Sequence, residues 1–198
     1  MDPQRWQREL NKRSLPAPKE QLASPTSSLQ VTRADVFNLG KADITDANAV
    51  QLLYLSLAWG LGTRASRLSP RLTALAKNMD RAPGLLREAW SATRTGQSPQ
   101  ACYEILLTPK GRPRIPWLGA AFATKFLYFA SGANPSPQNL ILDAVVAKNL
   151  RESAWANSPT YGWWSETYAE YCKLLARWAA ESNKAPDQVE MMLFTLKS

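Results

Sequence analysis

Apolar positions along most of the chain recur every three or four residues, and no segment alternates convincingly between apolar and polar residues. The pattern predicts an all-α protein of about nine or ten helices. A run of A-V-Q-L-L-Y-L-S-L-A indicates a buried central helix over residues 47–58, with Asp46 as its N-cap. Another amphipathic helix is predicted over residues 167–182, where Thr167 and Glu170 form a capping box.

The other predicted helices are separated by proline, glycine and capping residues. They cover residues 4–13, 32–41, 64–78, 82–96, 98–107 and 186–196, with one more after Gly119 and another headed by Asp143. The segment 14–28 holds three prolines and is typical of a linker or surface arm. We therefore expect an N-terminal helix and arm over residues 1–30, followed by one helical domain over residues 31–198.

Composition narrows the choice of partner. Of the 198 residues, 45% are hydrophobic, which is enough to bury the core of one compact domain. The formal net charge is +8, and such an excess favours a polyanion: nucleic acid first, an anionic membrane surface second. A soluble protein whose basicity is incidental is the alternative. The first 15 residues are polar, and no apolar run approaches the roughly 18 residues of a membrane span, so we expect a cytoplasmic protein outside the membrane.

Missing residue types exclude several kinds of site. The chain has no histidine, which excludes Ser-His-Asp and Cys-His catalysis and zinc sites of the Cys/His kind. The two cysteines, Cys102 and Cys172, cannot make a four-cysteine zinc site or an iron–sulfur cluster. Both lie in apolar helical segments, which favours buried free thiols over a single disulfide. We expect no metal bound by side chains.

The segment from residue 115 to residue 151 is the most informative part of the chain. A tight turn ends at Gly119 and leads directly into an apolar helix. The N–H groups at such a helix start have no intrahelical partners, and with the helix dipole they form a site suited to a phosphate. Arg112 and Arg114 precede the turn, and Lys125 follows it on the helix. In the alternative, Gly119 only ends a structural turn and the aromatic residues of the helix belong to the core.

Asp143 follows a proline-rich loop and heads the next apolar helix. Cleavage of an N-glycosidic bond builds positive charge on the sugar, which an ionised carboxylate can stabilise while it orients or deprotonates water. Because a nucleobase is a better leaving group than a sugar, one carboxylate can suffice where glycoside hydrolysis uses two. From composition alone, an N-cap aspartate with no other role is the commoner explanation.

A family resemblance rests on two segments: L-G-A-A-F-A-T-K-F-L-Y-F-A and, after a loop, L-I-L-D-A-V-V-A-K-N-L. Together they resemble the helix–hairpin–helix DNA glycosylases. Three segments resemble more closely a bacterial group of 8-oxoguanine glycosylase-like proteins: A-W-G-L-G-T-R, A-A-F-A-T-K-F-L-Y-F and E-T-Y-A-E-Y-C-K-L-L-A-R-W-A. This resemblance covers about residues 31–196. It implies a single-domain glycosylase-like fold with a cleft between two helical lobes, acting as a monomer on double-stranded DNA.

The resemblance also implies residue roles. The family's hairpin, of the type L-P-G-h-G with h apolar, precedes a helix, and the catalytic aspartate comes some twenty residues later. By this match Gly119 is the hairpin's last glycine and Asp143 the aspartate, while Trp117 replaces the first glycine. Ala121 occupies the position where bifunctional members carry a Schiff-base lysine, and Lys125 lies one turn further on the same helix face. We therefore expect a monofunctional glycosylase, with Lys125 as a second catalytic candidate.

The DNA backbone is expected to contact the hairpin and the basic residues around it: Trp117, Leu118, Gly119, Ala121, Arg112, Arg114, Arg67 and Arg71. Those contacts need no cofactor, although a monovalent cation can bind to the hairpin backbone. Base excision also needs a wedge that fills the gap in the stack. The candidates are Gly60, Leu61 and Arg64, for which a glycine-bent helix connection is the alternative.

The pocket for an extruded base is expected among the aromatic residues Trp59, Trp155, Trp163, Trp164, Tyr168 and Tyr171, since bases stack on aromatic rings. A loop packed on its own core would explain the same residues. The resemblance suggests 8-oxoguanine as the base, in DNA repair. A bulky modified cytosine of phage DNA, such as glucosylated hydroxymethylcytosine, is the alternative, in antiviral defence. The rival functions are a non-catalytic DNA-binding protein and a helical assembly protein.

Overall fold

The computed structural model describes residues 2–19, 30–62 and 65–196. Within these ranges the protein consists of ten α-helices and no strand, which confirms the all-α prediction. The helices are α1 (Pro3–Asn11), α2 (Arg33–Gly40), α3 (Asp46–Leu61), α4 (Leu68–Ala76), α5 (Ala82–Arg94), α6 (Pro99–Leu106), α7 (Ala120–Ala130), α8 (Ala144–Ser153), α9 (Ser165–Ser182) and α10 (Pro186–Thr195). None of the described helices is long and apolar enough to span a membrane.

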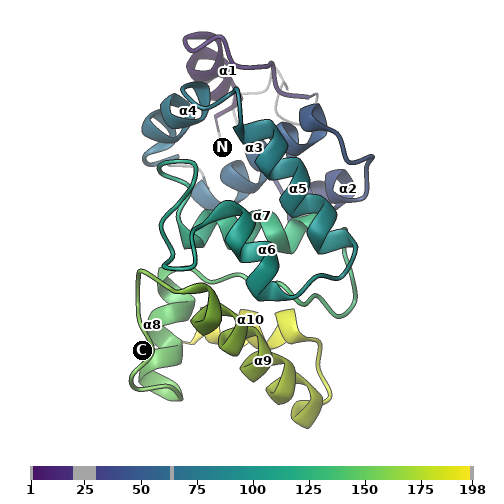
Figure 1. Ribbon diagram of the computed structural model, residues 1–198, viewed down its shortest axis with the longest axis vertical. Helices are drawn as coiled ribbons and strands as arrows, with labels where there is room; N and C mark the ends of the chain where they lie inside the picture. The colour runs from purple at the N-terminus through teal and green to yellow at the C-terminus, as the bar shows by residue number, and fades with distance from the viewer. Residues whose placement is uncertain (1, 20–29, 63–64, 197–198) are drawn as a thin grey trace.

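The helices gather into two groups along the long axis of the molecule (Figure 1). Helices α1 and α4 lie at one end, and α8, α9 and α10 lie at the other. Helix α3 packs against α2, α5 and α7, while α9 packs against α6 and α10, and α10 also packs against α8. Helix α7 lies between the two groups, so the residues on it can face both of them (Figure 1).

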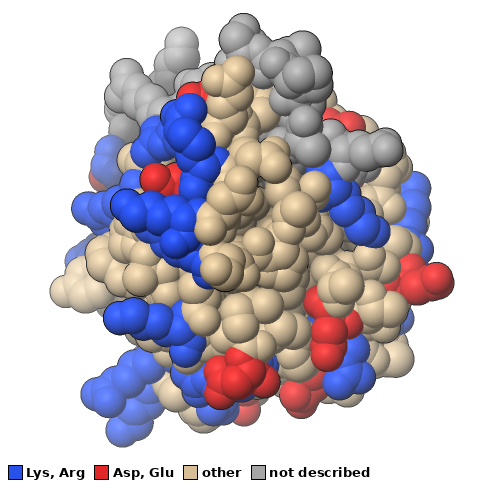
Figure 2. Space-filling model, turned by 90° about the horizontal axis from the view of Figure 1, so that it is seen from above, with Lys and Arg blue, Asp and Glu red and all other residues tan. Residues whose placement is uncertain are grey.

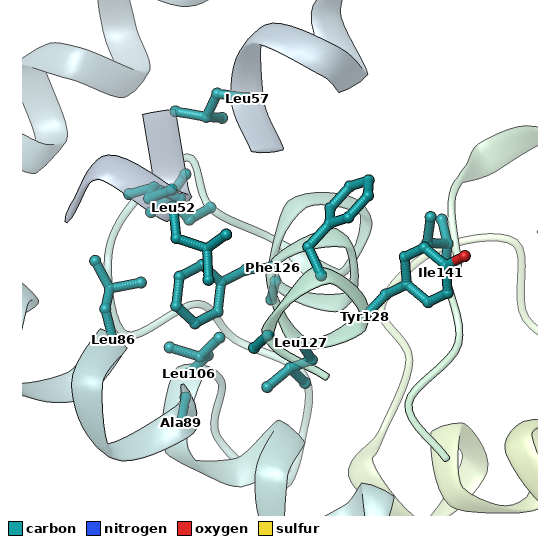
Figure 3. Close-up of a cluster of buried hydrophobic side chains, with 14 of the residues drawn as sticks. Leu52, Leu57, Leu86, Ala89, Leu106, Phe126, Leu127, Tyr128 and Ile141 are labelled. Carbon is teal, nitrogen blue, oxygen red and sulfur yellow. The ribbon is translucent and has the colours of Figure 1, made fainter. Parts of the chain in front are cut away.

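The core forms around α3, which is buried from Ala49 to Ala58 as the apolar run predicts. Leu52 of α3, Leu86 of α5, Leu106 of α6 and Phe126 of α7 converge in one cluster (Figure 3). Burial of such side chains is the main favourable term in folding, at roughly 1.5–3 kcal/mol for each. The cluster therefore ties α7 firmly to the first group of helices.

Two predicted details of α3 were wrong. The helix continues through Trp59 and Gly60 to Leu61 instead of ending near residue 58. A helix tolerates one glycine when neighbouring groups pack against it, and Gly60 has such neighbours on α7. The N-cap is Thr45, whose side chain accepts the Asn48 N–H, and Asp46 is the first helical residue.

Other helix starts agree in part with the sequence. Thr32 caps α2 in a capping box with Asp35, and Ser98 caps α6, both as predicted. The capping box at Thr167 was wrong, because α9 begins at Ser165. Ser165 instead donates a hydrogen bond to the Glu104 carboxylate at 2.6 Å, which fixes that helix start to α6.

The N-terminal segment packs onto the helical body. Trp6 and Leu10 of α1 are fully buried in the main core. Arg13 donates hydrogen bonds to Ser69 and Thr73 of α4 at 2.6 and 2.8 Å. Residues 20–29 of the expected arm lie outside the described ranges.

The two cysteines take no part in cross-links. Cys102 and Cys172 are buried free thiols, as expected. Burial raises the pKa of the Cys172 thiol to about 12, so this group stays protonated.

Candidate active site

An ion pair joins the middle of α7 to the start of α8. The Lys125 Nζ lies 2.9 Å from Asp143 Oδ2. The Lys125 side chain is 6% exposed and the Asp143 side chain is 18% exposed. The carboxylate is therefore the part of the pair that a bound molecule can reach first, with the ammonium group behind it.

Asp143 caps α8 with its other carboxylate oxygen. Oδ1 accepts the N–H groups of Val145 and Val146 at 3.1 and 3.2 Å. The residue therefore serves as an N-cap, as the sequence predicts, and Oδ2 remains for Lys125. The N-terminal end of the helix and the ammonium group both place positive charge against the carboxylate.

Three hydrogen bonds hold the segment that ends in Asp143. Thr124 of α7 accepts the Leu142 N–H at 3.0 Å. The Tyr168 hydroxyl donates to the Leu140 carbonyl at 3.0 Å, and the Tyr171 hydroxyl donates to the Ile141 carbonyl at 2.7 Å. Burial raises the pKa of both phenols, so they remain neutral donors. The backbone that aims the carboxylate is thus fixed from two helices.

Gly60 allows Lys125 to lie close to α3. A Cβ atom at residue 60 would be 2.9 Å from Lys125 Cδ and 3.1 Å from Phe122 Cε1. The absence of a side chain therefore makes room for the lysine stem. Gly60, predicted to belong to a wedge, lies in the structure against a candidate catalytic side chain.

We expect Gly60→Ala to lower the activity while leaving the stability of the fold nearly unchanged. An added methyl group pushes the Lys125 stem away from α3, and small misplacements of catalytic groups cost up to about 100-fold in rate. Alanine in place of glycine inside a helix favours folding by about 1 kcal/mol, which offsets the crowding. Catalytic activity should fall about 10-fold or more with little change in melting temperature. A matched Gly84→Ala variant, with open space around its Cβ, should keep full activity.

The hairpin before α7 has a glycine-like backbone at a residue that is not glycine. Trp117 has a φ of 68°, in the left-handed region where glycine is normally found, and its side chain is 50% exposed. Leu118 is buried, and its N–H donates to the Ile115 carbonyl at 3.1 Å. Helix α7 then begins after Gly119 with no side-chain cap. Its first N–H groups therefore have no side-chain competitor for a bound anion.

Two loops lie together beside this hairpin. The Ser165 N–H donates to the Pro109 carbonyl at 2.9 Å, and a Cβ on Gly111 would be only 2.1 Å from the Trp163 carbonyl oxygen. The joined loops expose basic and aromatic side chains: Lys110, Arg112, Arg114, Tyr161 and Trp164. Figure 2 shows Lys and Arg side chains gathered along one side of the face seen from above. Such a surface suits a phosphate backbone with nearby bases.

Helix α4 adds a further basic contact. The Arg71 guanidinium lies 4.3 Å from the Phe122 ring centroid and donates to the Arg67 carbonyl at 2.8 Å. Burial and the Arg67 charge lower the pKa of Arg71. Arg71 therefore lies beside the first turn of α7. Leu61 is half-buried at the end of α3, and Arg64 lies outside the described residues.

The aromatic residues proposed for the base pocket differ in how exposed they are in the structure. Trp59 is half-buried next to Gly60, and Trp164 is exposed. Trp163, Tyr168 and Tyr171 are core residues, at most 2% exposed. The two tyrosines lie on the face of α9 that packs toward α6 and the segment before α8. Tyr168 and Tyr171 therefore hold backbone carbonyls and offer no free ring face for a base.

Trp155 lies in a different place from the ion pair. It lines a surface pocket of about 600 Å³ between α8 and α9, together with Leu174 and Trp178. Neither Lys125 nor Asp143 lines that pocket. Within the described residues, no group of three or more His, Cys, Asp or Glu side chains could hold a metal ion.

Some contributors to the site were not found from the sequence. Thr124 positions the Asp143 segment, and Arg33 and Glu190 lie close enough for their charges to act on neighbouring groups of the site. Their local sequence carries no signal of this, since they come from three different helices that meet only in the folded chain.

Comparison with known proteins adds one finding. The model of the family described as "Putative 8-oxoguanine DNA glycosylase OGG-like protein" matches residues 1–194. A search of curated proteins found no match. A search of solved structures likewise found none.

Proposed function

Because the chain belongs to the OGG-like family of DNA glycosylases, we propose that it excises a damaged or modified base from double-stranded DNA by hydrolysis. The observation that carries this proposal is the Lys125–Asp143 pair. Its carboxylate is partly exposed, fixed by backbone hydrogen bonds, and located near an uncapped helix start. An extruded nucleotide needs such a carboxylate at its sugar and amides at its phosphate.

In the proposed reaction the bond between C1′ and the base nitrogen breaks, and the electron pair leaves with the base. Asp143 stabilises the positive charge that develops on the sugar. Water then forms the new bond to C1′, and its proton passes to the carboxylate or to solvent. Lys125 Nζ, held 2.9 Å from Asp143 Oδ2, orients the carboxylate and takes no covalent part in the reaction. The product is an abasic site in an unbroken strand.

Two bases are the substrates to test. The family description names 8-oxoguanine, which supports a role in DNA repair. Glucosylated hydroxymethylcytosine is the alternative and would place it in defence against phage DNA. Both require a flipped nucleotide, and Trp59, half-buried beside Gly60, remains a candidate to stack on it.

The test uses two labelled duplexes, each with one of these bases at a single position. Hydrolysis alone gives a strand that breaks only after alkali treatment. Breakage without alkali, together with an adduct trapped by borohydride, would instead make Lys125 a nucleophile. DNA that binds but never acquires an alkali-sensitive site would favour the rival function, a non-catalytic DNA-binding protein.

We expect Trp117→Gly to weaken DNA binding while stabilising the fold. Glycine adopts the positive φ of 68° without the roughly 1–3 kcal/mol of strain that another residue incurs. Loss of an exposed indole that stacks on DNA should weaken affinity about 10-fold. Fluorescence anisotropy and thermal unfolding measure the two effects. Met192→Ala, which removes an exposed side chain on α10, is the control. Equal DNA affinities for the two variants would contradict the assignment of Trp117 to the DNA contact.

A further inference from the structure

A buried carboxyl group with one oxygen that lacks a hydrogen bond acts electrostatically on the catalytic pair. Glu190 of α10 is 2% exposed, and its Oε2 atom has no hydrogen-bond partner. An ion pair with Arg33, at 3.6 Å between Nη2 and Oε2, is longer than a hydrogen bond. Burial of a carboxylate so weakly compensated is costly, so the position calls for a functional explanation.

Arg33 is held by other groups and cannot move closer without losing them. It donates a hydrogen bond to the Tyr128 hydroxyl at 2.9 Å, and that hydroxyl donates to Asp187 Oδ2 at 2.8 Å. The guanidinium carbon also lies 5.3 Å from the centroid of the Trp59 ring. The geometry therefore leaves the charge of Glu190 only partly balanced.

The charged and titratable groups that act on Glu190 come from every neighbouring element: Arg33 of α2, Lys125 and Tyr128 of α7, Asp143 before α8, Tyr171 of α9 and Asp187 of α10. Burial raises the pKa of Glu190 to about 7. Asp143 and Asp187 raise it as well, while Arg33 and Lys125 lower it. Glu190 thus shares its electrostatic environment with both members of the catalytic pair.

We propose that Glu190 is a positioning residue for the catalytic pair: its charge partly balances the Lys125 ammonium group and thereby sets the pH range of excision. The inference rests on the proposed function. An ionised Glu190 offsets part of the positive charge of Lys125 while that residue stays in place beside Asp143, so more of the negative charge of Asp143 acts on the sugar. The added negative charge also favours the sugar cation. A neutral Glu190 leaves the charge of Lys125 balanced by Asp143 alone.

The expected result is an excision rate that rises with pH. Single-turnover rates of the wild type should increase about 10-fold between about pH 6 and pH 8, with a midpoint near 7. Glu190→Gln should remove this inflection and leave KM unchanged, because residue 190 is too buried to touch DNA. Glu190→Asp should restore an inflection. Glu181→Gln, on the exposed face of α9, should follow the wild-type profile.

Two results would overturn the inference while leaving the proposed function intact: a flat wild-type profile, or an unchanged inflection in Glu190→Gln. Absence of excision at every pH would overturn both. A second measurement tests the protonation of the buried Glu190 carboxyl group and does not depend on the excision assay. Its folded-state pKa lies above the ordinary 4.5, so protonation favours folding, and stability declines as pH rises from about 5 to 8. The melting temperature of Glu190→Gln should lack this decline, and parallel melting curves would count against the proposal.

Discussion

Asp143→Asn should lower the single-turnover excision rate by on the order of 10³-fold. The asparagine side chain lacks the negative charge that stabilises the sugar cation, and its amide is a poor acceptor for a proton from water. The substitution also removes the ionic partner of Lys125, whose Nζ lies 2.9 Å from the carboxylate. Affinity for the same DNA should change little, because the expected phosphate contacts come from the hairpin and the loops.

The fold provides a control for this variant. The carbonyl oxygen of the introduced asparagine can still accept the N–H groups of Val145 and Val146, and asparagine is as good an N-cap as aspartate. The N-cap contribution to stability should therefore be kept. Loss of the charge that balances the nearly buried Lys125 should lower the free energy of unfolding by up to about 3–5 kcal/mol, so thermal unfolding must show that the variant is folded at the assay temperature. A folded variant that retains more than about a tenth of the wild-type rate would remove Asp143 from the mechanism.

Phe126→Ala should destabilise the protein by about 3–5 kcal/mol. Phe126 is fully buried where α3, α5, α6 and α7 meet (Figure 3). Its neighbours Leu53, Leu86 and Leu106 line only a very small void, of about 10 Å³, so truncation leaves a cavity that the packed helices cannot fill. Denaturant unfolding measures the loss, and the melting temperature should fall by about 10 °C.

Phe194→Ala is the matched control, because Phe194 of α10 is 44% exposed. Truncation there should cost less than about 1 kcal/mol. A similarly small loss for Phe126→Ala would mean that α7 is not fixed by this cluster. Such a result would also weaken the case for a rigid Lys125, which lies one residue before Phe126 on the same helix.

The positions of most helices could be predicted because they depend on local chemistry. Thr32 and Ser98 carry capping side chains, and Asp143 heads an apolar stretch, so the start of each helix is encoded within a few residues. The end of α3 was misplaced because Gly60 suggests a break locally, while packing against Lys125 and Phe122 favours a continuous helix. Tertiary contacts of this kind have no local sequence signal.

The candidate site likewise combines features that have a local sequence signal with features that arise only from tertiary contacts. Spacing and resemblance singled out Asp143 and the Gly119 turn, and helix periodicity singled out Lys125. The structure shows the cap, the helix start and the ion pair at these positions, while their catalytic roles stay predictions. The roles of Tyr168 and Tyr171 were not found, since a sequence cannot distinguish a ring that stacks on a base from one that holds a carbonyl. Arg33 and Glu190 approach the site only through the packing of α2, α7 and α10, and their wide separation along the chain hides that contact.

The most direct measurement is mass spectrometry of free bases released from DNA by the wild type and by Asp143→Asn, with damaged DNA and phage-modified DNA as substrates. The expected result is one free base, 8-oxoguanine or glucosylated hydroxymethylcytosine, released by the wild type and absent with the variant. Equal release by both proteins, or none by the wild type from either DNA, would contradict the role given to this carboxylate.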